Sequence, residues 1–177
     1  MTVFTVGHST RTIADFIALL RPAGVERAVD VRAIARSRTN PQFNTEALRA
    51  SLAAAGMDYV HLPALGGRRG RSGSGPSPNA LWRNAAFRNY ADYAAGDEFR
   101  AGLAELKALA ERDCSAIMCA EAVWWRCHRA LISDYLKVRG IEVMHIVDAN
   151  KGEPHRYTAA AQIVNGELSY APSEPLL

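Results

Sequence analysis

Three features that are scarce or missing narrow the class of protein. The 177-residue sequence contains three cysteines, an odd number too small for a disulfide framework, so we expect free thiols in a reducing compartment. No apolar run approaches the roughly 20 residues that cross a bilayer, so we expect no membrane partner. The first residues lack the basic region and the small-residue cleavage site of a signal peptide. Together these absences predict a cytoplasmic protein.

Lysine is absent from the middle third of the chain, where arginine carries all the positive charge. Between Asp30 and Tyr90 there are nine arginines and three acids, so this stretch carries +6, and a net charge of +3 leaves −3 for the rest. Arginine suits planar, bidentate contacts to carboxylate or phosphate groups. A general preference for arginine in the genome explains the pattern equally well, and the sequence does not decide between the two interpretations.

The pattern of apolar residues predicts an α/β fold. The chain is 49% hydrophobic and 22% charged, as ordinary globular proteins are, so it can bury a core of its own. The expected strands cover 3–6, 25–31, 59–62, 116–119 and 141–147, and the expected helices cover 12–20, 45–55, 85–95, 97–112 and 131–139. This order predicts a single three-layer domain over 1–177, with a mainly parallel five-stranded sheet and helices on both faces.

Two further segments are distinct in composition. Residues 64–80 are rich in Gly, Arg and Ser, which predicts a flexible loop without regular structure. Asn165-Gly166 stands between two short β-prone runs, which predicts a C-terminal β-hairpin. This hairpin either adds an antiparallel edge to the sheet or folds over one of its faces.

Polar and reactive side chains gather where the predicted strands end. In an open parallel sheet, ligands bind beyond the carboxyl ends of the strands. The residues at these ends are His8 and Ser9, Asp30 and Arg32, His61, Cys119 and Glu121, and His145 with Asp148. We therefore expect one ligand or active site at this edge of the sheet.

The segment from Cys119 to Arg129, C-A-E-A-V-W-W-R-C-H-R, carries the most chemistry. It leaves a buried strand and enters a helix, whose N-terminal amides attract anions and lower the pKa of a nearby thiol. Cys119 is placed either as a nucleophile or as the last core residue of its strand, and both interpretations stay open. Cys127 could be a resolving thiol, a metal ligand or a packing residue, and we favour packing.

The sequence contains residue types that could form a metal site. Cys119, Cys127, His128 and His8 could supply a tetrahedral set of ligands. The two cysteines are too far apart in sequence for a CxxC knuckle, and no second cysteine pair exists. We therefore predict no metal and no cofactor.

Several motifs resemble those of the domain of unknown function 488 family. They are T-V-G-H-S-T-R, D-V-R followed by N-P-Q-F-N, L-G-G-R, F-R-N-Y-A-D-Y, and C-A-E followed by C-H-R-A, in the family's order from residue 5 to about 146. The resemblance implies a compact α/β domain of unassigned biochemistry. It points to His8, Ser9, Arg11, Asp30, Arg32, Arg36, Asn44, Gly66, Gly67, Cys119, Glu121, Cys127, His128 and Arg129 as the site.

A weaker likeness connects the chain to rhodanese-like and cysteine-phosphatase folds. D-V-R at the end of one strand and a cysteine at the end of a later strand are similar to those proteins. Their anion-binding loop from Cys to Arg is short, whereas Arg126 and Arg129 lie seven and ten residues past Cys119 here. This departure weighs against a simple phosphatase or sulfurtransferase.

These observations favour an enzyme that acts on an anionic, phosphate- or nucleotide-like small molecule. The expected catalytic residues are Cys119 as nucleophile or redox-active thiol, His8 or His128 as its activator, and Glu121 as general acid or base. The expected substrate-binding residues are Ser9, Arg11, Asp30, Arg32, Arg36, Asn44, Gly66, Gly67, Arg126 and Arg129. Two alternatives stay open: a nucleic-acid-binding module that uses the arginine-rich loops, and a non-catalytic regulatory or scaffold domain. The sequence leaves the oligomeric state undetermined.

Overall fold

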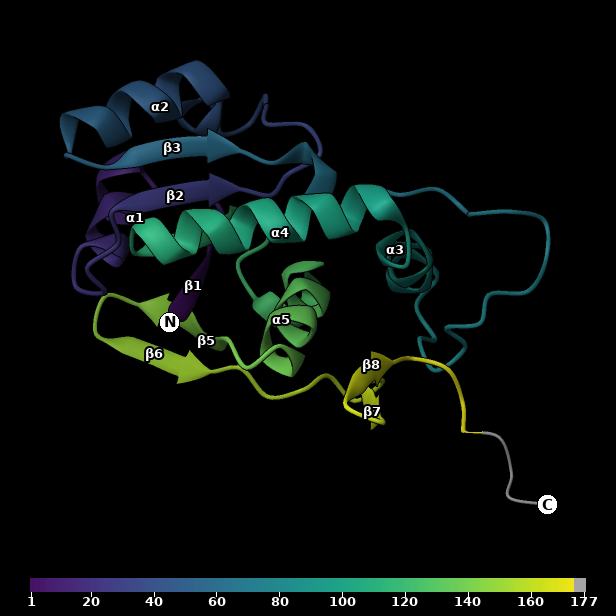
Figure 1. Ribbon diagram of the computed structural model, residues 1–177. Coiled ribbons are helices and arrows are strands. Elements are labelled where there is room, and N and C mark those ends of the chain that lie inside the picture. The colour runs from purple at the N-terminus through teal and green to yellow at the C-terminus, as the bar shows by residue number, and fades with distance from the viewer. Residues whose placement is uncertain (174–177) are drawn as a thin grey trace.

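Within residues 1–173, six strands form one sheet in the order β3-β2-β4-β1-β5-β6, and five α-helices cover it (Figure 1). The structure is a computed structural model in which residues 1–173 are described. The strands are β1 (Thr2–Gly7), β2 (Arg27–Asp30), β3 (Asp58–His61), β4 (Ser115–Cys119), β5 (Glu142–Asp148) and β6 (Lys151–Pro154). The helices are α1 (Ile13–Leu20), α2 (Thr45–Ala54), α3 (Ala85–Ala94), α4 (Asp97–Arg112) and α5 (Arg129–Val138). The predicted α/β fold with a mainly parallel sheet is confirmed.

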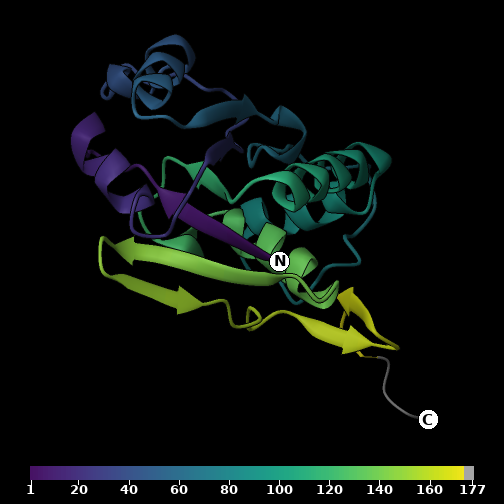
Figure 2. The ribbon, with the colours of Figure 1, turned by 60° about the vertical axis from the view of Figure 1, so that its left-hand side comes forward.

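The two faces of the sheet bury separate apolar clusters. Alternate strand residues point to opposite faces, so Ala116 and Met118 pack with α1 and α2, whereas Ile117 between them packs with α3, α4 and α5. The first cluster centres on Phe16, Leu20, Leu48 and Leu52, and the second on Tyr90, Phe99, Leu106 and Leu131. Figure 2 shows the sheet between these two layers of helices. The expected three layers are therefore present.

The first helix begins where its sequence signature predicts. The hydroxyl oxygen of Thr12 accepts a hydrogen bond from the backbone N–H of Asp15 at 3.1 Å, which satisfies one of the free amides of α1. The helix buries Phe16, Leu19 and Leu20 and stops before Pro22. Among residues 1–173, no helix combines the length and the apolar character needed to span a bilayer.

The carboxyl-terminal part of the chain contains one strand that the sequence did not indicate. β6 pairs antiparallel with β5, and its residues, K-G-E-P, have no apolar alternation because most of the strand is exposed at the sheet edge. The predicted hairpin is present as β7 (Gln162–Val164) and β8 (Glu167–Ser169), joined by Asn165 and Gly166 with φ of 53° and 81°. Since β6 occupies the edge of the sheet, the hairpin forms a separate two-stranded sheet.

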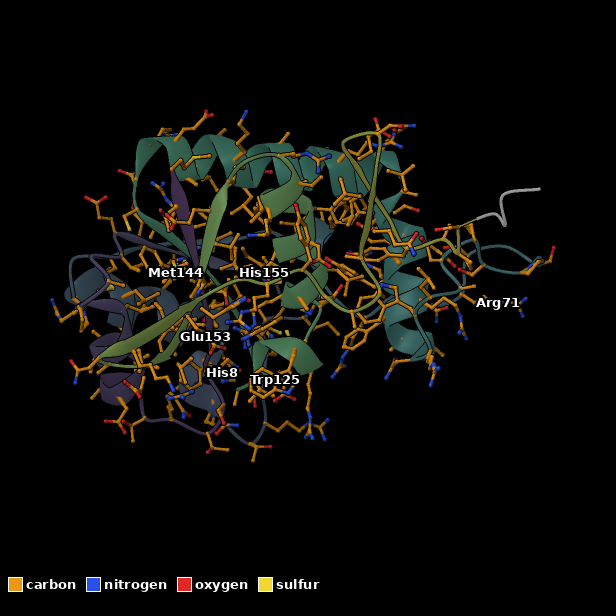
Figure 3. The ribbon with its side chains drawn as sticks, turned by 90° about the horizontal axis from the view of Figure 1, so that it is seen from below. His8, Arg71, Trp125, Met144, Glu153 and His155 are labelled. Atoms are coloured by element: carbon orange, nitrogen blue, oxygen red, sulfur yellow. The ribbon has the colours of Figure 1, made fainter. Side chains whose placement is uncertain are left out.

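The arginine- and glycine-rich loop contains no helix or strand between Gly66 and Asn84. Part of it is held by its own side chains. Arg69 donates to the carbonyl oxygens of Gly66 and Pro63, and Arg71 donates to those of Ser74 and Gly75. Figure 3 shows Arg71 at one edge of the molecule and His8 nearer its middle, so the tip of this loop projects away from the carboxyl end of β1.

Candidate active site

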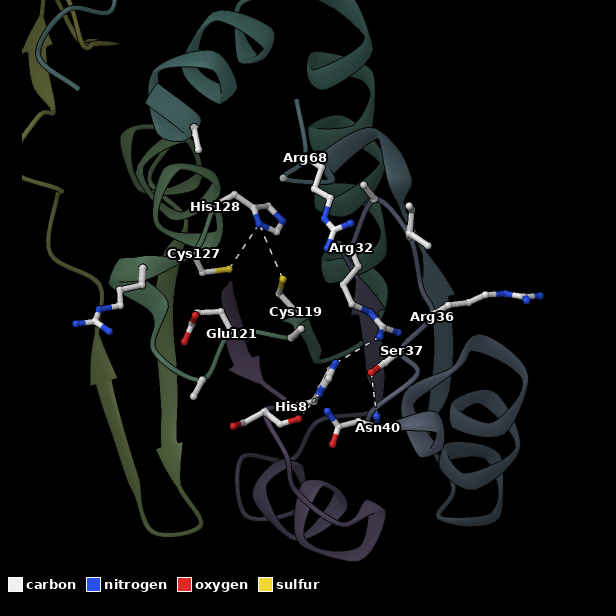
Figure 4. Close-up of a pocket in the computed structure, with 18 of the residues that line it drawn as sticks. His8, Arg32, Arg36, Ser37, Asn40, Arg68, Cys119, Glu121, Cys127 and His128 are labelled. Atoms are coloured by element: carbon white, nitrogen blue, oxygen red, sulfur yellow. Dashed lines mark hydrogen bonds between the residues drawn. The ribbon is translucent and has the colours of Figure 1, made fainter. Parts of the chain in front are cut away.

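A cavity of about 680 Å³ opens at the carboxyl ends of β1, β2 and β4. The parallel register brings these ends level, because Gly7 pairs with Cys119 and Asp30 pairs with Met118. Figure 4 shows two cysteines and a histidine on one side of the cavity and arginines on the other. The lining includes these predicted site residues: His8, Ser9, Arg32, Arg36, Gly67, Cys119, Glu121, Arg126 and His128.

The loop after β1 crosses the loop after β4 at very close range. The backbone N–H of His8 donates to Cys119 O at 2.8 Å, and that of Ser9 donates to Ala120 O at 3.0 Å. A Cβ on Gly7 would lie 1.9 Å from the carbonyl oxygen of Glu121, so only glycine fits there. Ser9 follows with a φ of 50°, a left-handed conformation that is uncommon for a residue with a side chain.

Cys119, Cys127 and His128 form a tight group, which we call the sulfur–imidazole cluster. Their two Sγ atoms and the Nδ1 atom all lie within 4.8 Å of one another. His128 Nδ1 is 3.9 Å from Cys119 Sγ and 3.5 Å from Cys127 Sγ. Cys127, for which packing was the favoured role, is thus buried but also part of the cavity wall.

The orientation of the His128 ring is fixed on every side. Its Nε2 lies 2.8 Å from the carbonyl oxygen of Val31, which can only accept, so Nε2 carries a proton and Nδ1 is left to face the sulfurs. The ring packs against Tyr90 at a centroid distance of 5.4 Å. Gly67 lies over its other side, where a Cβ would come within 2.4 Å of Nδ1.

The two thiols of the cluster have opposite pKa shifts. The hydrogen bond to Cys127, together with burial, raises the pKa of the Cys119 thiol well above its ordinary value. Burial also acts to raise the pKa of Cys127, but the hydrogen bond from Cys119 and the nearby His128 and Arg129 together hold that pKa well below its ordinary value. The pair is therefore best described as a Cys127 thiolate that accepts a hydrogen bond from the Cys119 thiol.

Arg32 follows the carboxyl end of β2, His8 follows the carboxyl end of β1, and the two side chains are in contact. Arg32 forms a bidentate ion pair with buried Asp30, with Nε–Oδ1 at 2.9 Å and Nη2–Oδ2 at 2.6 Å. Its Nη1 reaches His8 Nε2 at 3.4 Å, and His8 stacks on Phe43. Burial is the main cause that lowers the pKa of His8, and the charge of Arg32 acts in the same direction. The hydrogen bond between His8 and the carbonyl oxygen of Ser9 acts to raise that pKa but does not offset them. Within residues 1–173, no hydrogen bond links the His8 imidazole to the Cys119 thiol, so His128 is the nearer imidazole partner of the thiols.

Arg129 lies beneath the cavity and does not line it. Its guanidinium is 1% exposed and donates to Glu121 O at 2.6 Å, to Thr5 Oγ1 at 3.3 Å and to Cys127 Sγ at 3.4 Å. It therefore holds the loop after β4 against β1 and stabilises negative charge on Cys127. The Glu121 side chain is exposed and lines the cavity.

The remaining predicted binding residues lie outside the cavity lining. Arg11 donates to the carbonyl oxygen of Gly7 at 2.6 Å. Asp30 is fully buried and receives bonds from Arg32 and from the Tyr59 hydroxyl. Asn44 accepts from the backbone N–H of Ser37, and Gly66 packs against Ala33, which a Cβ would approach to 2.5 Å. These residues shape the loops around the cavity, and their proposed contact with a substrate remains a prediction.

The cavity also contains residues that sequence reasoning did not select as site residues. They are Arg68, Tyr90, Ser37 and Asn40, among others. Arg68 and Tyr90 stand inside the L-G-G-R and F-R-N-Y motifs, so the motifs themselves could have indicated them. Nothing in the sequence marks Ser37 and Asn40 as site residues. They reach the cavity wall through a turn, in which the backbone N–H of Asn40 donates to the Ser37 hydroxyl oxygen at 2.9 Å.

Comparison with known proteins gave one result of use. The model of the family described as Domain of unknown function DUF488 matches residues 12–136. This range contains every side chain of the sulfur–imidazole cluster and most of the cavity wall. A search of the curated proteins and a search of the solved structures gave no match.

Proposed function

The chain belongs to the DUF488 family, whose function is unknown, and we propose that it is an enzyme that acts on an anionic small molecule in the cavity. One observation carries the proposal: the sulfur–imidazole cluster faces Arg32, Arg36 and Arg68 across one open cavity (Figure 4). Large cavities with a few convergent polar groups are the usual form of small-molecule sites.

The charge of the cavity wall supports an anionic substrate. Arg36, Arg68 and Arg126 line the cavity, and none of them makes an ion pair or donates a side-chain hydrogen bond within residues 1–173. Glu121 is the carboxylate that lines it, since Asp30 lies behind Arg32 and neutralises it. Unpaired guanidinium groups bind phosphate or carboxylate strongly.

The cluster supports covalent chemistry at Cys119. Cys119 is a half-buried residue of the cavity wall, whereas Cys127 is buried. When the Cys119 sulfur bonds to an electrophilic atom of the substrate, its proton passes to the Cys127–His128 pair and the bond to the leaving group breaks. We assign the proton exchange with that leaving group to Glu121, because this residue lines the cavity.

The test uses two alkylating reagents that differ in charge. Cys119 is protonated at rest, but its proton can pass to the Cys127–His128 pair, and Cys127 itself is buried. We therefore expect anionic iodoacetate to label Cys119 faster than Cys114 and Cys127, and inorganic phosphate to slow this reaction, measured by peptide mass spectrometry with a chelator present. The ratio of the iodoacetate labelling rate to the iodoacetamide labelling rate at Cys119 should be higher in the folded protein than in the unfolded chain. We call this difference the excess preference for iodoacetate. The double variant Arg36→Gln/Arg68→Gln should lose the excess because it removes the attracting charges.

The matched control is Arg38→Gln/Arg83→Gln. Both of these arginines are exposed and outside the cavity lining, and the total charge change is the same. The control should keep the preference for iodoacetate. Equal and slow labelling of all three cysteines would contradict the proposal, and so would an equal loss in the two double variants.

The nucleic-acid alternative has less support. Two of the arginines that would contact phosphates already make contacts within the protein. The Arg69 guanidinium lies 3.7 Å from the centre of the Tyr93 ring, and Arg71 donates hydrogen bonds to carbonyl oxygens of its own loop. Trp124 is stacked on His145 at 4.2 Å and donates to Glu153, so one face of its ring is already used within the protein. Trp125 remains exposed as the one tryptophan of this pair available for stacking.

A further inference from the structure

We propose that the sulfur–imidazole cluster is a binding site for a soft divalent cation, with Zn²⁺ as the best-fitting ion. The ligands would be Cys119 Sγ, Cys127 Sγ and His128 Nδ1. The inference is independent of the proposed function, because the free thiol and the zinc thiolate are alternative states of the same three side chains.

The distances within the cluster match those of a zinc tetrahedron. Zinc lies about 2.3 Å from sulfur and about 2.0–2.1 Å from nitrogen, so two tetrahedral ligands are about 3.5–3.8 Å apart. The measured separations are 3.5 Å from His128 Nδ1 to Cys127 Sγ and 3.9 Å from Nδ1 to Cys119 Sγ. The two sulfurs lie within 4.8 Å of one another, so an ion can enter with ligand shifts of at most about 1 Å.

The surroundings of the cluster also suit a metal. The Nε2–H of His128 donates to Val31 O at 2.8 Å, which aims the Nδ1 lone pair at the sulfurs, and metal-bound histidines almost always have such a partner. Cys127 Sγ receives the backbone N–H of Arg129 at 3.5 Å and its Nε–H at 3.4 Å. These donors stabilise a thiolate, so the site is largely formed before any ion binds.

The fourth coordination position would open into the cavity. All three ligands line the cavity, and the exposed guanidinium groups of Arg36 and Arg68 line it as well. Zinc sites with three protein ligands keep the fourth position for water or for a substrate atom. An anion held by the arginines could thus reach the ion directly.

The spacing of Cys119 and Cys127 concealed this site. Eight positions separate the two cysteines, which excludes a CxxC knuckle. Here the 3₁₀ helix Trp124–Arg126 and the crossing at Gly7 fold the segment back, so that Cys127 and His128 return to the end of β4. The sequence-based prediction of no metal rested on that spacing and on the lack of a second cysteine pair.

The test is titration of the reduced, metal-free protein with Zn²⁺ and with Co²⁺. We expect one Zn²⁺ per chain to remain after dialysis, and Co²⁺ to produce thiolate-to-cobalt charge-transfer bands and the visible bands of a tetrahedral site. Cys119→Ser, Cys127→Ser and His128→Gln should each weaken Zn²⁺ binding at least about 100-fold, whereas Cys114→Ser, away from the cluster, should leave it unchanged.

Circular dichroism controls for folding, because Cys127 and His128 are buried. If the Cys127 or His128 variant unfolds, two other measurements test the zinc site. They are Zn²⁺ binding by Cys119→Ser, which changes a less buried residue, and the protection of wild-type Cys119 from iodoacetamide by Zn²⁺. Zn²⁺ binding that survives all three substitutions, or Co²⁺ bands without sulfur charge transfer, would overturn the proposal. The absence of Zn²⁺ uptake by the fully reduced protein would do so too. None of these outcomes depends on alkylation by iodoacetate, so this proposal and the proposed enzyme can fail separately.

Discussion

At the scale of single residues, two glycines permit the site to form by leaving room for other groups. Gly7 lets the carbonyl of Glu121 approach the end of β1, and Gly67 makes room for the His128 ring. Neither residue supplies chemistry itself. The resemblance to a family pointed to Gly67, but only the three-dimensional structure shows that its role is to admit the imidazole.

We expect Gly67→Ala to displace His128 from the two sulfurs. A Cβ at this position would lie 2.4 Å from Nδ1, so the ring or the loop must move, at a cost of about 1–3 kcal/mol in stability. Urea unfolding measures the stability, and the rate of iodoacetamide labelling of Cys119 measures the change at the cluster.

Gly70→Ala is the control for this substitution. A Cβ on Gly70 meets no atom within 4 Å, and the residue lies three positions along the same loop. Its stability should stay within about 0.5 kcal/mol of the wild type and its labelling rate should not change. Identical behaviour of the two variants would show that Gly67 does not position His128.

At the scale of elements, a buried carboxylate connects the C-terminal segment to α5. Asp134 in α5 is fully buried and accepts from His155 Nε2 at 2.8 Å, from the backbone and hydroxyl of Thr158, and from the Tyr170 hydroxyl at 2.9 Å. These partners follow β6 and β8 in the chain. One helix residue therefore holds a stretch that has little apolar surface of its own.

Asp134→Ala should destabilise the protein by about 3–5 kcal/mol, because two buried and two part-buried donor groups lose their acceptor. Hydrogen exchange should show the largest loss of protection between residues 155 and 170. Asp97→Ala is the control, since that carboxylate is 99% exposed in its pair with Arg100 and should contribute less than about 1 kcal/mol. A uniform loss of protection over the sheet would argue against a local role.

At the scale of the whole molecule, buried histidines connect stability to pH. His145 bonds to Thr5 and His155 and faces Trp124, Arg129 and Cys127. Burial, and then the charges of His155 and Arg129, lower the pKa of His145 to about 3 in the folded protein. In the unfolded chain a histidine titrates at about 6.5, so unfolding takes up a proton between these two values.

The protein should therefore lose stability as the pH falls from about 6.5 towards 3, with a slope from His145 of up to about 1.4 kcal/mol per pH unit. Above pH 6.5 this contribution is complete and constant. His145→Gln should reduce the slope without abolishing it, because burial also lowers the pKa of His8. Urea unfolding at a series of pH values measures how the free energy of unfolding depends on pH. An unchanged slope in His145→Gln would refute the assignment of this pH dependence to His145.

Local pattern was enough to place most elements. The Thr12 cap, the apolar stripe of α4 and the Asn165-Gly166 turn each depend on neighbours in sequence, so their signals survive without tertiary information. β6 gave no such signal, because an exposed edge strand gains its pairing from the backbone of β5 and needs no apolar side chains.

The sequence by itself determined that reactive side chains stand at the ends of parallel strands, because strand order and polarity follow from residue pattern. Which of those side chains meet was decided only by the tertiary structure. Cys127 and His128 return to Cys119 across the 3₁₀ helix Trp124–Arg126, whereas Asp30 and Arg129 turn away from the cavity into buried ion pairs and hydrogen bonds. Distances between groups far apart in sequence depend on how the layers pack, and local residue patterns carry no record of that packing.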